Sequence, residues 1–348
     1  MDMASPRRCS LHCFSFAFFL LLRSSSKYMR FKATIRDQRT LVAICQLCRR
    51  SERSGVVVRL HATRLHFFTR AQVGHGMQVF AICRTESVFS EFHAQSGQKY
   101  LQNGGDSASG RGEANTIYCE IIDTVRLVHV LRQAEHCQSV SIKLTKNAKK
   151  RLVLRIAMGG MQPHVDVSHD VPVCVLSLAE TESISFPLLS ANIAVLELDG
   201  LTELTMFVEK LRWTCDQITF TAKRNNDTTT ENFVDRTCSL VVEAECPAAS
   251  FALEYKSVVH VQKGRNEGGE ESVEARGIDD IADPKESQCS FLVASVTIEL
   301  KSLVRFLPIR DFTPCRVLLY LDHERTIAFH VFTSDCTTLL GYMPAVTN

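Results

Sequence analysis

The chain has 348 residues, of which 45% are hydrophobic and 22% charged, with a formal net charge of +2. This length suffices for about two domains, and the composition excludes a disordered or fibrous chain. After the first 28 residues no apolar run reaches the roughly 18 residues that a membrane-spanning helix needs, so we expect no integral membrane protein.

The first apolar segment is CFSFAFFLLL at 13–22, which follows the basic pair Arg7 and Arg8 as in a secretory signal peptide. Met29 offers a second start codon, and no clear small-x-small cleavage site precedes it. We expect residues 1–28 to be an extension that is not part of the folded protein. An organelle or secretory signal and an amphipathic anchor are the alternatives.

From Met29 the chain shows a strand, a helix and two strands. In MRFKATI the apolar residues alternate with polar ones, which predicts a half-buried strand over 29–35. Residues 38–50 place Leu41, Ile44, Cys45 and Cys48 on one helical face. GVVVRL at 55–60 and RLHFFT at 64–69 read as the next two strands.

The same order of strand, helix and strands returns three times. The predicted helices are 123–137, 201–212 and 299–307, and the strands before them are TIYCEI, IAVLEL and VASVTI. Four units imply two domains of two units each. About twelve to fourteen strands with four sizeable helices cannot form a covered parallel sheet, so the predicted class is α+β with antiparallel sheets.

Three connecting segments separate these units. Residues 97–115 are rich in Gly, Ser and Asn and predict a loop, and 177–192 lack steady periodicity and predict the connection between domains. Residues 264–288 carry eight acidic residues against three basic ones and predict a surface loop.

The fourteen cysteines have no repeating spacing, and most lie in apolar runs such as VPVCVL. This pattern predicts small buried side chains in a reducing compartment rather than disulfides. Cys45-x-x-Cys48 has no second pair or following histidines at zinc spacing, so no metal site is predicted.

The solvent faces of the four predicted helices are more basic than acidic. Two interpretations of these faces stay open. They are the ordinary solvent-exposed sides of amphipathic helices, or together they form one positive surface that follows a phosphate backbone without reading bases. The basic residues are Arg39, Arg49, Arg50, Arg126, Arg132, Lys210, Arg212, Lys301 and Arg305.

Four short motifs carry a family resemblance. MRFKATIRD, HDVPVCVL at 169–176, GLTELTMFVEKL at 200–211 and LLGYMPAV at 339–346 resemble the Hus-type subunit of the nine-one-one checkpoint clamp, a relative of the proliferating cell nuclear antigen. The resemblance runs from Met29 to Asn348. It implies a two-domain sliding-clamp fold with helices lining a channel and sheets outside.

The resemblance divides the chain into an N-terminal clamp domain at 29–176, a connector at 177–192 and a C-terminal clamp domain at 193–348 with the acidic insert 264–288. It implies a nuclear subunit, present also in the nucleolus or cytoplasm, of a ring of three different clamp chains that encircles double-stranded DNA. A separate ATP-dependent loader would open the ring. The nine basic residues would face the channel.

Ring closure in clamps joins the edge strand of one domain to that of a neighbouring subunit. By similarity these edges lie at 168–176 and near 250–258. The interface residues implied are Pro172, Val173, Val175, Phe251, Leu253 and Tyr255. Pro172 suits an edge or bulge because it lacks a donor; the alternative is an internal edge covered by a loop.

Clamp connectors receive peptides from checkpoint and repair proteins. The implied partner-binding residues here are Ile184, Phe186, Leu188 and Leu189. The acidic insert has no family counterpart that could be placed, and the connector lacks basic and tryptophan residues, which leaves its client proteins open.

Nothing in the sequence predicts catalysis or a cofactor. A Walker-type phosphate loop, G-x-S-x-G and H-E-x-x-H are all absent from the sequence. Two alternatives stay open: a homotrimeric processivity-type clamp, and a secreted or membrane-anchored binding protein with disulfides. Counting twelve or fourteen free thiols under denaturing conditions would eliminate the second.

Overall fold

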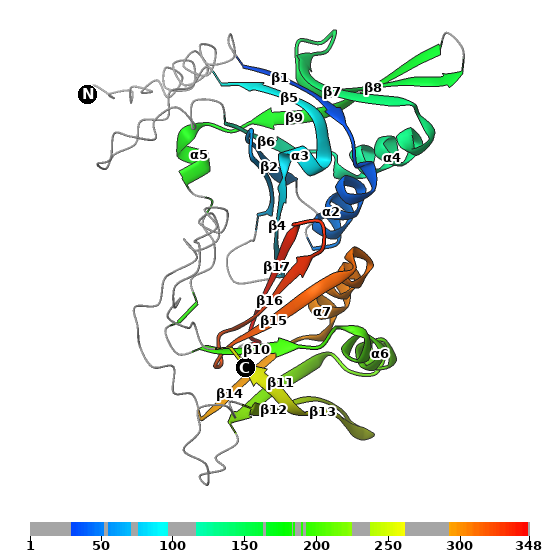
Figure 1. The fold of residues 1–348 in the computed structure, drawn as a ribbon. Coiled ribbons are helices and arrows are strands. Elements are labelled where there is room, and N and C mark those ends of the chain that lie inside the picture. The colour runs from blue at the N-terminus through cyan, green and yellow to red at the C-terminus, as the bar shows by residue number, and fades with distance from the viewer. Residues whose placement is uncertain are drawn as a thin grey trace, which may run out of the picture.

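Two halves of similar build make up the protein (Figure 1). We call residues 29–176 the N-terminal half and 193–346 the C-terminal half. The computed structural model describes residues 29–51, 55–70, 76–96, 116–162, 165–182, 184, 189–190, 193–224, 237–261 and 292–346. The predicted extension 1–28, the loop 97–115 and the insert 264–288 lie outside the described residues.

The N-terminal half contains nine described strands. They are β1 (Arg30–Ile35), β2 (Val56–Leu60), β3 (Arg64–Thr69), β4 (Gln78–Arg84), β5 (Phe89–Gln95), β6 (Ile117–Ile121), β7 (Ser139–Lys146), β8 (Leu152–Gln162) and β9 (Val165–Val175). Its helices are α2 (Gln38–Ser51), α3 (Thr85–Val88), α4 (Thr124–Gln133) and the 3-10 turn η3 (Ala134–His136).

The C-terminal half repeats this plan. Its strands are β10 (Ile193–Leu198), β11 (Gln217–Arg224), β12 (Thr237–Cys246), β13 (Ala249–His260), β14 (Val293–Glu299), β15 (Pro314–Asp322), β16 (Thr326–Thr333) and β17 (Thr338–Pro344). Its helices are α6 (Thr202–Leu211), α7 (Leu300–Phe306) and the 3-10 segment η4 (Leu307–Phe312). A short helix, α5 (Leu178–Glu182), follows β9 in the stretch between the halves.

The local patterns explain these elements. Phe31 and Ala33 of β1 are buried while Arg30 and Lys32 are exposed, as alternation in a half-buried strand requires. The apolar face predicted for α2 is buried. Asp123 directly precedes helix α4, and its carboxylate accepts a hydrogen bond from the Arg126 amide at 2.9 Å and caps the first turn.

The strands pair antiparallel along one continuous path. Its order is β5-β1-β7-β8-β9-β6-β2-β3-β4-β17-β16-β15-β10-β13-β12-β11-β14. The predicted α+β class with antiparallel sheets is confirmed. The estimate of twelve to fourteen strands is too low, since the described residues form seventeen. One example is β5, which buries only Phe89 and so carries little apolar alternation.

The two halves join through β4 and β17. Residues 78–82 of β4 pair in register with 338–342 of β17, and β17 also pairs with β16. Gly341 therefore stands between Val79 on one side and Phe329 on the other. The buried ring of Phe306, from α7, packs directly over Gly341 and lies 5.5 Å from the Phe329 ring.

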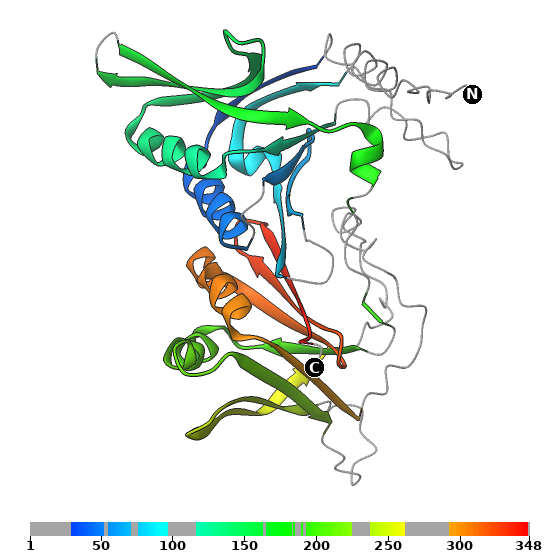
Figure 2. The same ribbon diagram turned by 180° about the vertical axis from the view of Figure 1, so that it is seen from behind.

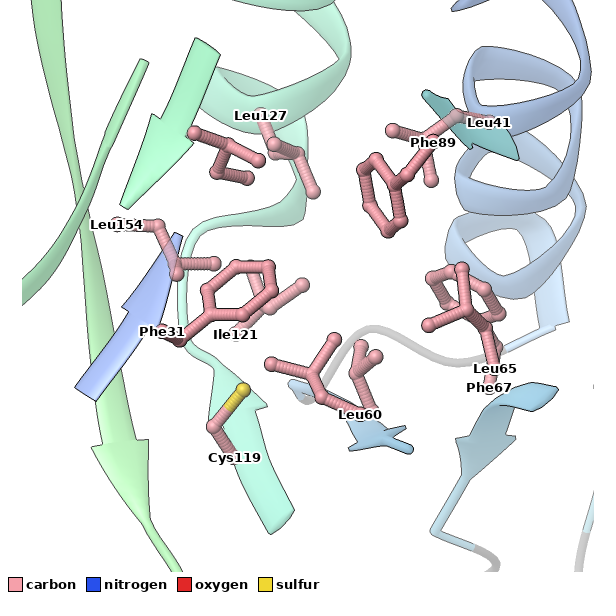
Figure 3. Close-up of a pocket in the computed structure, with 12 residues that line it drawn as sticks. Phe31, Leu41, Leu60, Leu65, Phe67, Phe89, Cys119, Ile121, Leu127 and Leu154 are labelled. Carbon is pink, nitrogen blue, oxygen red and sulfur yellow. The ribbon is translucent and has the colours of Figure 1, made fainter. Parts of the chain in front are cut away.

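A small apolar cavity lies in the core of the N-terminal half (Figure 3). Its volume is about 30 Å³, and side chains from strands β1, β2, β3, β5, β6, β7 and β8 and from helices α2 and α4 point into it. All twelve lining residues are apolar, so the cavity offers a water molecule no hydrogen-bond partner. The lining residues include Cys119 of β6, whose thiol pKa is raised to about 12 by burial.

We expect Cys119→Val to stabilise the N-terminal half slightly. Valine replaces the sulfur with one methyl group and adds a second methyl group to the cavity wall, and burying one such added group is worth about 0.8 kcal/mol. The urea midpoint of unfolding should rise. Cys174→Val is the matched control, because Cys174 lies on the neighbouring strand β9, is exposed and does not line the cavity. An equal rise in both variants would contradict a cavity-filling effect.

Of the fourteen cysteines, the structure describes eleven, and all eleven are free thiols. Cys45 and Cys48 of α2 are buried, as their helical spacing predicts. Across the described ranges no helix combines the length and apolar character needed to cross a bilayer.

Candidate nucleic-acid interface and strand edges

The four main helices lie on one side of the molecule. This is the right side in Figure 1 and the left side in Figure 2, and the order from one end to the other is α4, α2, α7, α6. Contacts between α4 and α2, between α2 and α7, and between α7 and α6 make the row continuous. Each helix buries its apolar face against the sheets and turns its polar face outward.

All nine basic residues predicted for the channel lie on or directly after these helices. Eight are exposed and one, Arg305, is half-buried. The exposed ones are Arg39, Arg49, Arg50, Arg126, Arg132, Lys210, Arg212 and Lys301. The structure therefore gathers cations from four distant stretches of chain on one side.

Polar contacts tie α2 to the α4 segment. Arg39 forms an ion pair with Glu135 at 3.3 Å, and Gln38 donates a hydrogen bond to the Leu131 carbonyl. With its amide oxygen turned toward α4, Gln46 accepts from Nε of Arg132 at 3.0 Å. Glu135 offsets part of the charge of Arg39, whereas the contact with neutral Gln46 leaves the charge of Arg132 uncompensated.

Other cations in the row carry no such compensation. For Arg49, Arg50, Lys210 and Lys301, no ion pair forms within the described ranges of the chain. Exposed and unpaired cations of this kind attract anions and release counterions when phosphates approach.

Strand β9 belongs to two sheets in succession. It pairs with β8 as far as Pro172 and with β6 from Val173 to Val175, and the Pro172 carbonyl accepts from the Ile122 amide at 3.2 Å. Pro172, Val173 and Val175 thus already have neighbours in their own chain. Upstream, at 167–171, one edge of β9 pairs with β8 and its other edge faces no strand among the described residues.

An ion pair fixes this upstream part of β9. Arg155 of β8 donates to both carboxylate oxygens of Asp170, at 2.7 and 3.0 Å. These hydrogen bonds hold the pKa of Asp170 below its usual value. The β8–β9 hairpin therefore presents an edge that is held in a defined position.

Strand β13 forms a second open edge at the opposite end of the molecule (Figure 1). One edge of β13 pairs with β12 from Ala249 to Val259, and Val259 and His260 pair with β10, so the other edge at 249–257 has no strand partner in the described chain. Leu253 and Tyr255 pack half-buried against the protein's own core, and burial raises the pKa of Tyr255 to about 12. The strand therefore offers a partner its backbone edge and Phe251, which is 37% exposed.

Sequence reasoning missed several exposed apolar side chains near these two ends. Ile122 and Val125, before and within α4, are 60% and 54% exposed, and Met206 of α6 is 51% exposed. Trp213, directly after α6, is 82% exposed. A signal existed: Met206 and Trp213 are seven positions apart and lie opposite the buried face of α6.

The connector residues predicted to bind partners divide into two groups. Ile184 and Leu189 pack against an apolar cluster on the far side of the central strands from the helices, whereas Phe186 and Leu188 lie outside the described residues. The buried members of this cluster are Val57, Phe68, Phe80, Leu176, Ala328, Leu340 and Tyr342. The two described side chains thus cover the central sheet where the halves meet.

No metal site accompanies these surfaces. Where the structure describes the chain, no three His, Cys, Asp or Glu side chains converge to hold an ion.

Comparison with solved structures defines the fold. The proliferating cell nuclear antigen of Entamoeba histolytica is 10% identical, with a TM-score of 0.57 over 91% of this chain and 99% of that one. The same antigen from Thermococcus kodakaraensis is 13% identical, with a TM-score of 0.54 over 90% and 99%. The protein therefore has the sliding-clamp fold, as predicted.

The family follows from the sequence profile that matches the chain. The profile described as Hus1-like protein matches residues 29–347, so the chain belongs to the Hus1-like family. This confirms the predicted resemblance. A search of curated proteins gives no match.

Proposed function

We propose that the protein is a non-catalytic subunit of a heterotrimeric clamp that encircles double-stranded DNA. One observation carries the proposal: a row of basic helices runs between the edge of β9 at one end of the molecule and the edge of β13 at the opposite end, and each of these edges has a stretch without a strand partner among the described residues. An arc with such ends closes into a ring when each edge pairs with another chain. Membership of the Hus1-like family supports a checkpoint clamp rather than a replicative one.

The basic row would hold DNA without reading its sequence. Lysine and arginine side chains neutralise phosphates and release counterions, which gives attraction that does not depend on the bases. Because none of these contacts is tied to one register, a closed ring can slide along the duplex. The chain's own role is then to enclose and orient rather than to catalyse.

Loading and signalling would depend on other proteins. A separate ATP-dependent loader opens the ring at damaged DNA in the nucleus, and checkpoint and repair proteins dock on the outer surface. The apolar cluster beneath Ile184 and Leu189 supports such docking, since an apolar sheet face covered by a connector can accept apolar side chains of a peptide.

The first experiment is native affinity purification of the endogenous protein with mass spectrometry of its partners. Two different clamp-like chains in equal amount are expected. Recovery with further copies of itself would instead establish a homotrimeric clamp, and recovery alone would overturn the ring.

We expect Ile122→Glu and Phe251→Glu each to remove a different partner. A carboxylate placed beside either strand edge has to lose its water when a partner covers that edge. This desolvation penalty exceeds the free energy that the edge contact contributes. Both side chains are partly exposed, so the fold should survive. Co-purification from cells checks this.

Leu292→Glu is the matched control, since Leu292 is 67% exposed and directly precedes β14, which β11 and β12 separate from β13 in the sheet. It should retain both partners. Loss of both partners in either edge variant, with an unchanged unfolding curve, would contradict the assignment of one edge to each partner.

A further inference from the structure

Trp213 is the one tryptophan of the chain, and it stands in the turn after α6 with 82% of its surface exposed. Tryptophan has the largest side chain and gains more than most residues from burial. Such a ring left in water on a folded surface marks a contact site.

The turn that carries this ring is well ordered by hydrogen bonds. The Leu211 carbonyl accepts from the amides of Thr214 and Cys215, at 2.9 and 3.0 Å, and from the Thr214 hydroxyl at 3.2 Å. Leu211 and Cys215 are both buried. The backbone on both sides of Trp213 is therefore anchored, and the ring is held away from the core.

Arg212 occupies one face of the ring. Its guanidinium carbon lies 4.8 Å from the ring centroid, within the range of a cation–π contact. A single guanidinium covers one face, and the exposure of Trp213 shows that much of the remaining ring surface is open. The pair thus presents a flat aromatic surface with a cation behind it.

Charge alone does not single out this turn within the helix row. Lys210 and Arg212 are balanced by Glu209 and Asp216, so the turn has no net formal charge. Counterion release at Lys210 and Arg212 is therefore no stronger here than elsewhere in the row. Stacking, in contrast, needs an aromatic face and a nearby cation, and both are present.

We propose that Trp213 and Arg212 form a stacking site for an unpaired base of single-stranded DNA. Bases of an intact duplex are stacked on one another and do not offer a free face, whereas every base of a single strand does. Arg212, next to the stacked base, would contact its phosphate. The inference rests on the proposed function, because it assumes that the helix row faces DNA.

The single tryptophan makes the test direct. Fluorescence of the full chain is titrated with oligothymidylate and, separately, with a blunt duplex of equal length. We expect the single strand to quench the emission and the duplex to leave it nearly unchanged. Stacking of one base corresponds to about 5- to 150-fold in affinity, so Trp213→Ala should weaken oligothymidylate binding by that factor.

Trp213→Phe is the matched variant, which keeps an aromatic face and should retain most of the affinity. Equal quenching by duplex, or unchanged single-strand affinity in Trp213→Ala, would overturn the inference. A blue shift when co-purified clamp partners are added without DNA would also overturn it and assign the ring to a subunit contact.

The two proposals fail separately. If two clamp-like partners co-purify and oligothymidylate produces no quenching, the stacking site is wrong and the ring stands. If quenching occurs without such partners, the stacking site stands and the ring is wrong.

Discussion

Gly341→Val is expected to destabilise the protein by about 3 kcal/mol or more, at the upper end of the range for overpacked cores. A Cβ atom at this position would overlap the ring of Phe306, with Cδ2 and Cζ only 2.6 and 2.8 Å away. The ring cannot easily move, because it is fully buried and packs on Phe329. Urea or thermal unfolding measures the loss.

A double-mutant cycle identifies the cause. Phe306→Ala alone should cost about 3–5 kcal/mol, because it leaves a cavity. If overlap with the ring causes the loss, the double variant Gly341→Ala/Phe306→Ala should lose clearly less stability than Gly341→Ala and Phe306→Ala lose in sum when each is made alone. Additive losses, or a Gly341→Val protein as stable as the original, would show that the close approach is unimportant.

Reversing three charges of the helix row should weaken duplex binding about a hundredfold. Arg50, Lys210 and Lys301 come from three different helices and are exposed, so the triple change to glutamate alters charge with little effect on packing. Three lost phosphate contacts at roughly 1 kcal/mol each give this factor. The slope of log affinity against log salt concentration should fall by about 2.7.

The matched control reverses Lys32, Lys143 and Lys223 on the outer sheet surfaces. These side chains are exposed and alternate with buried strand neighbours, so they lie on the faces turned away from the core. The net-charge change is the same in both triple variants. An equal loss of DNA affinity would show that total charge matters and that the helix row has no special role.

Local periodicity predicted most of the fold. Alternation in MRFKATI and the helical spacing from Leu41 to Cys48 identify one face of each element, and those faces are the buried ones. The fourfold recurrence of the pattern then indicated two similar halves. These signals lie within a few residues of one another, which is why a single sequence carries them.

Pairing between distant strands was not predictable in the same way. A period of two tells which face of a strand is buried, but it does not identify the neighbouring strand. The sequence therefore did not show that residues 173–175 pair with β6, and nothing local shows that β17 pairs with β4. Trp213 was missed although its spacing of seven positions from Met206, opposite the buried face of α6, was a local signal.

The pairing of β4 with β17 also bears on how a ring made from this chain could open. Backbone hydrogen bonds cross from one half to the other, so bending the arc at its middle would break several of them together. At the ends, opening separates one chain from another and leaves each fold intact. We therefore expect such a ring to open at the subunit contact on β9 or β13, while the described strands of the two halves move as one rigid unit.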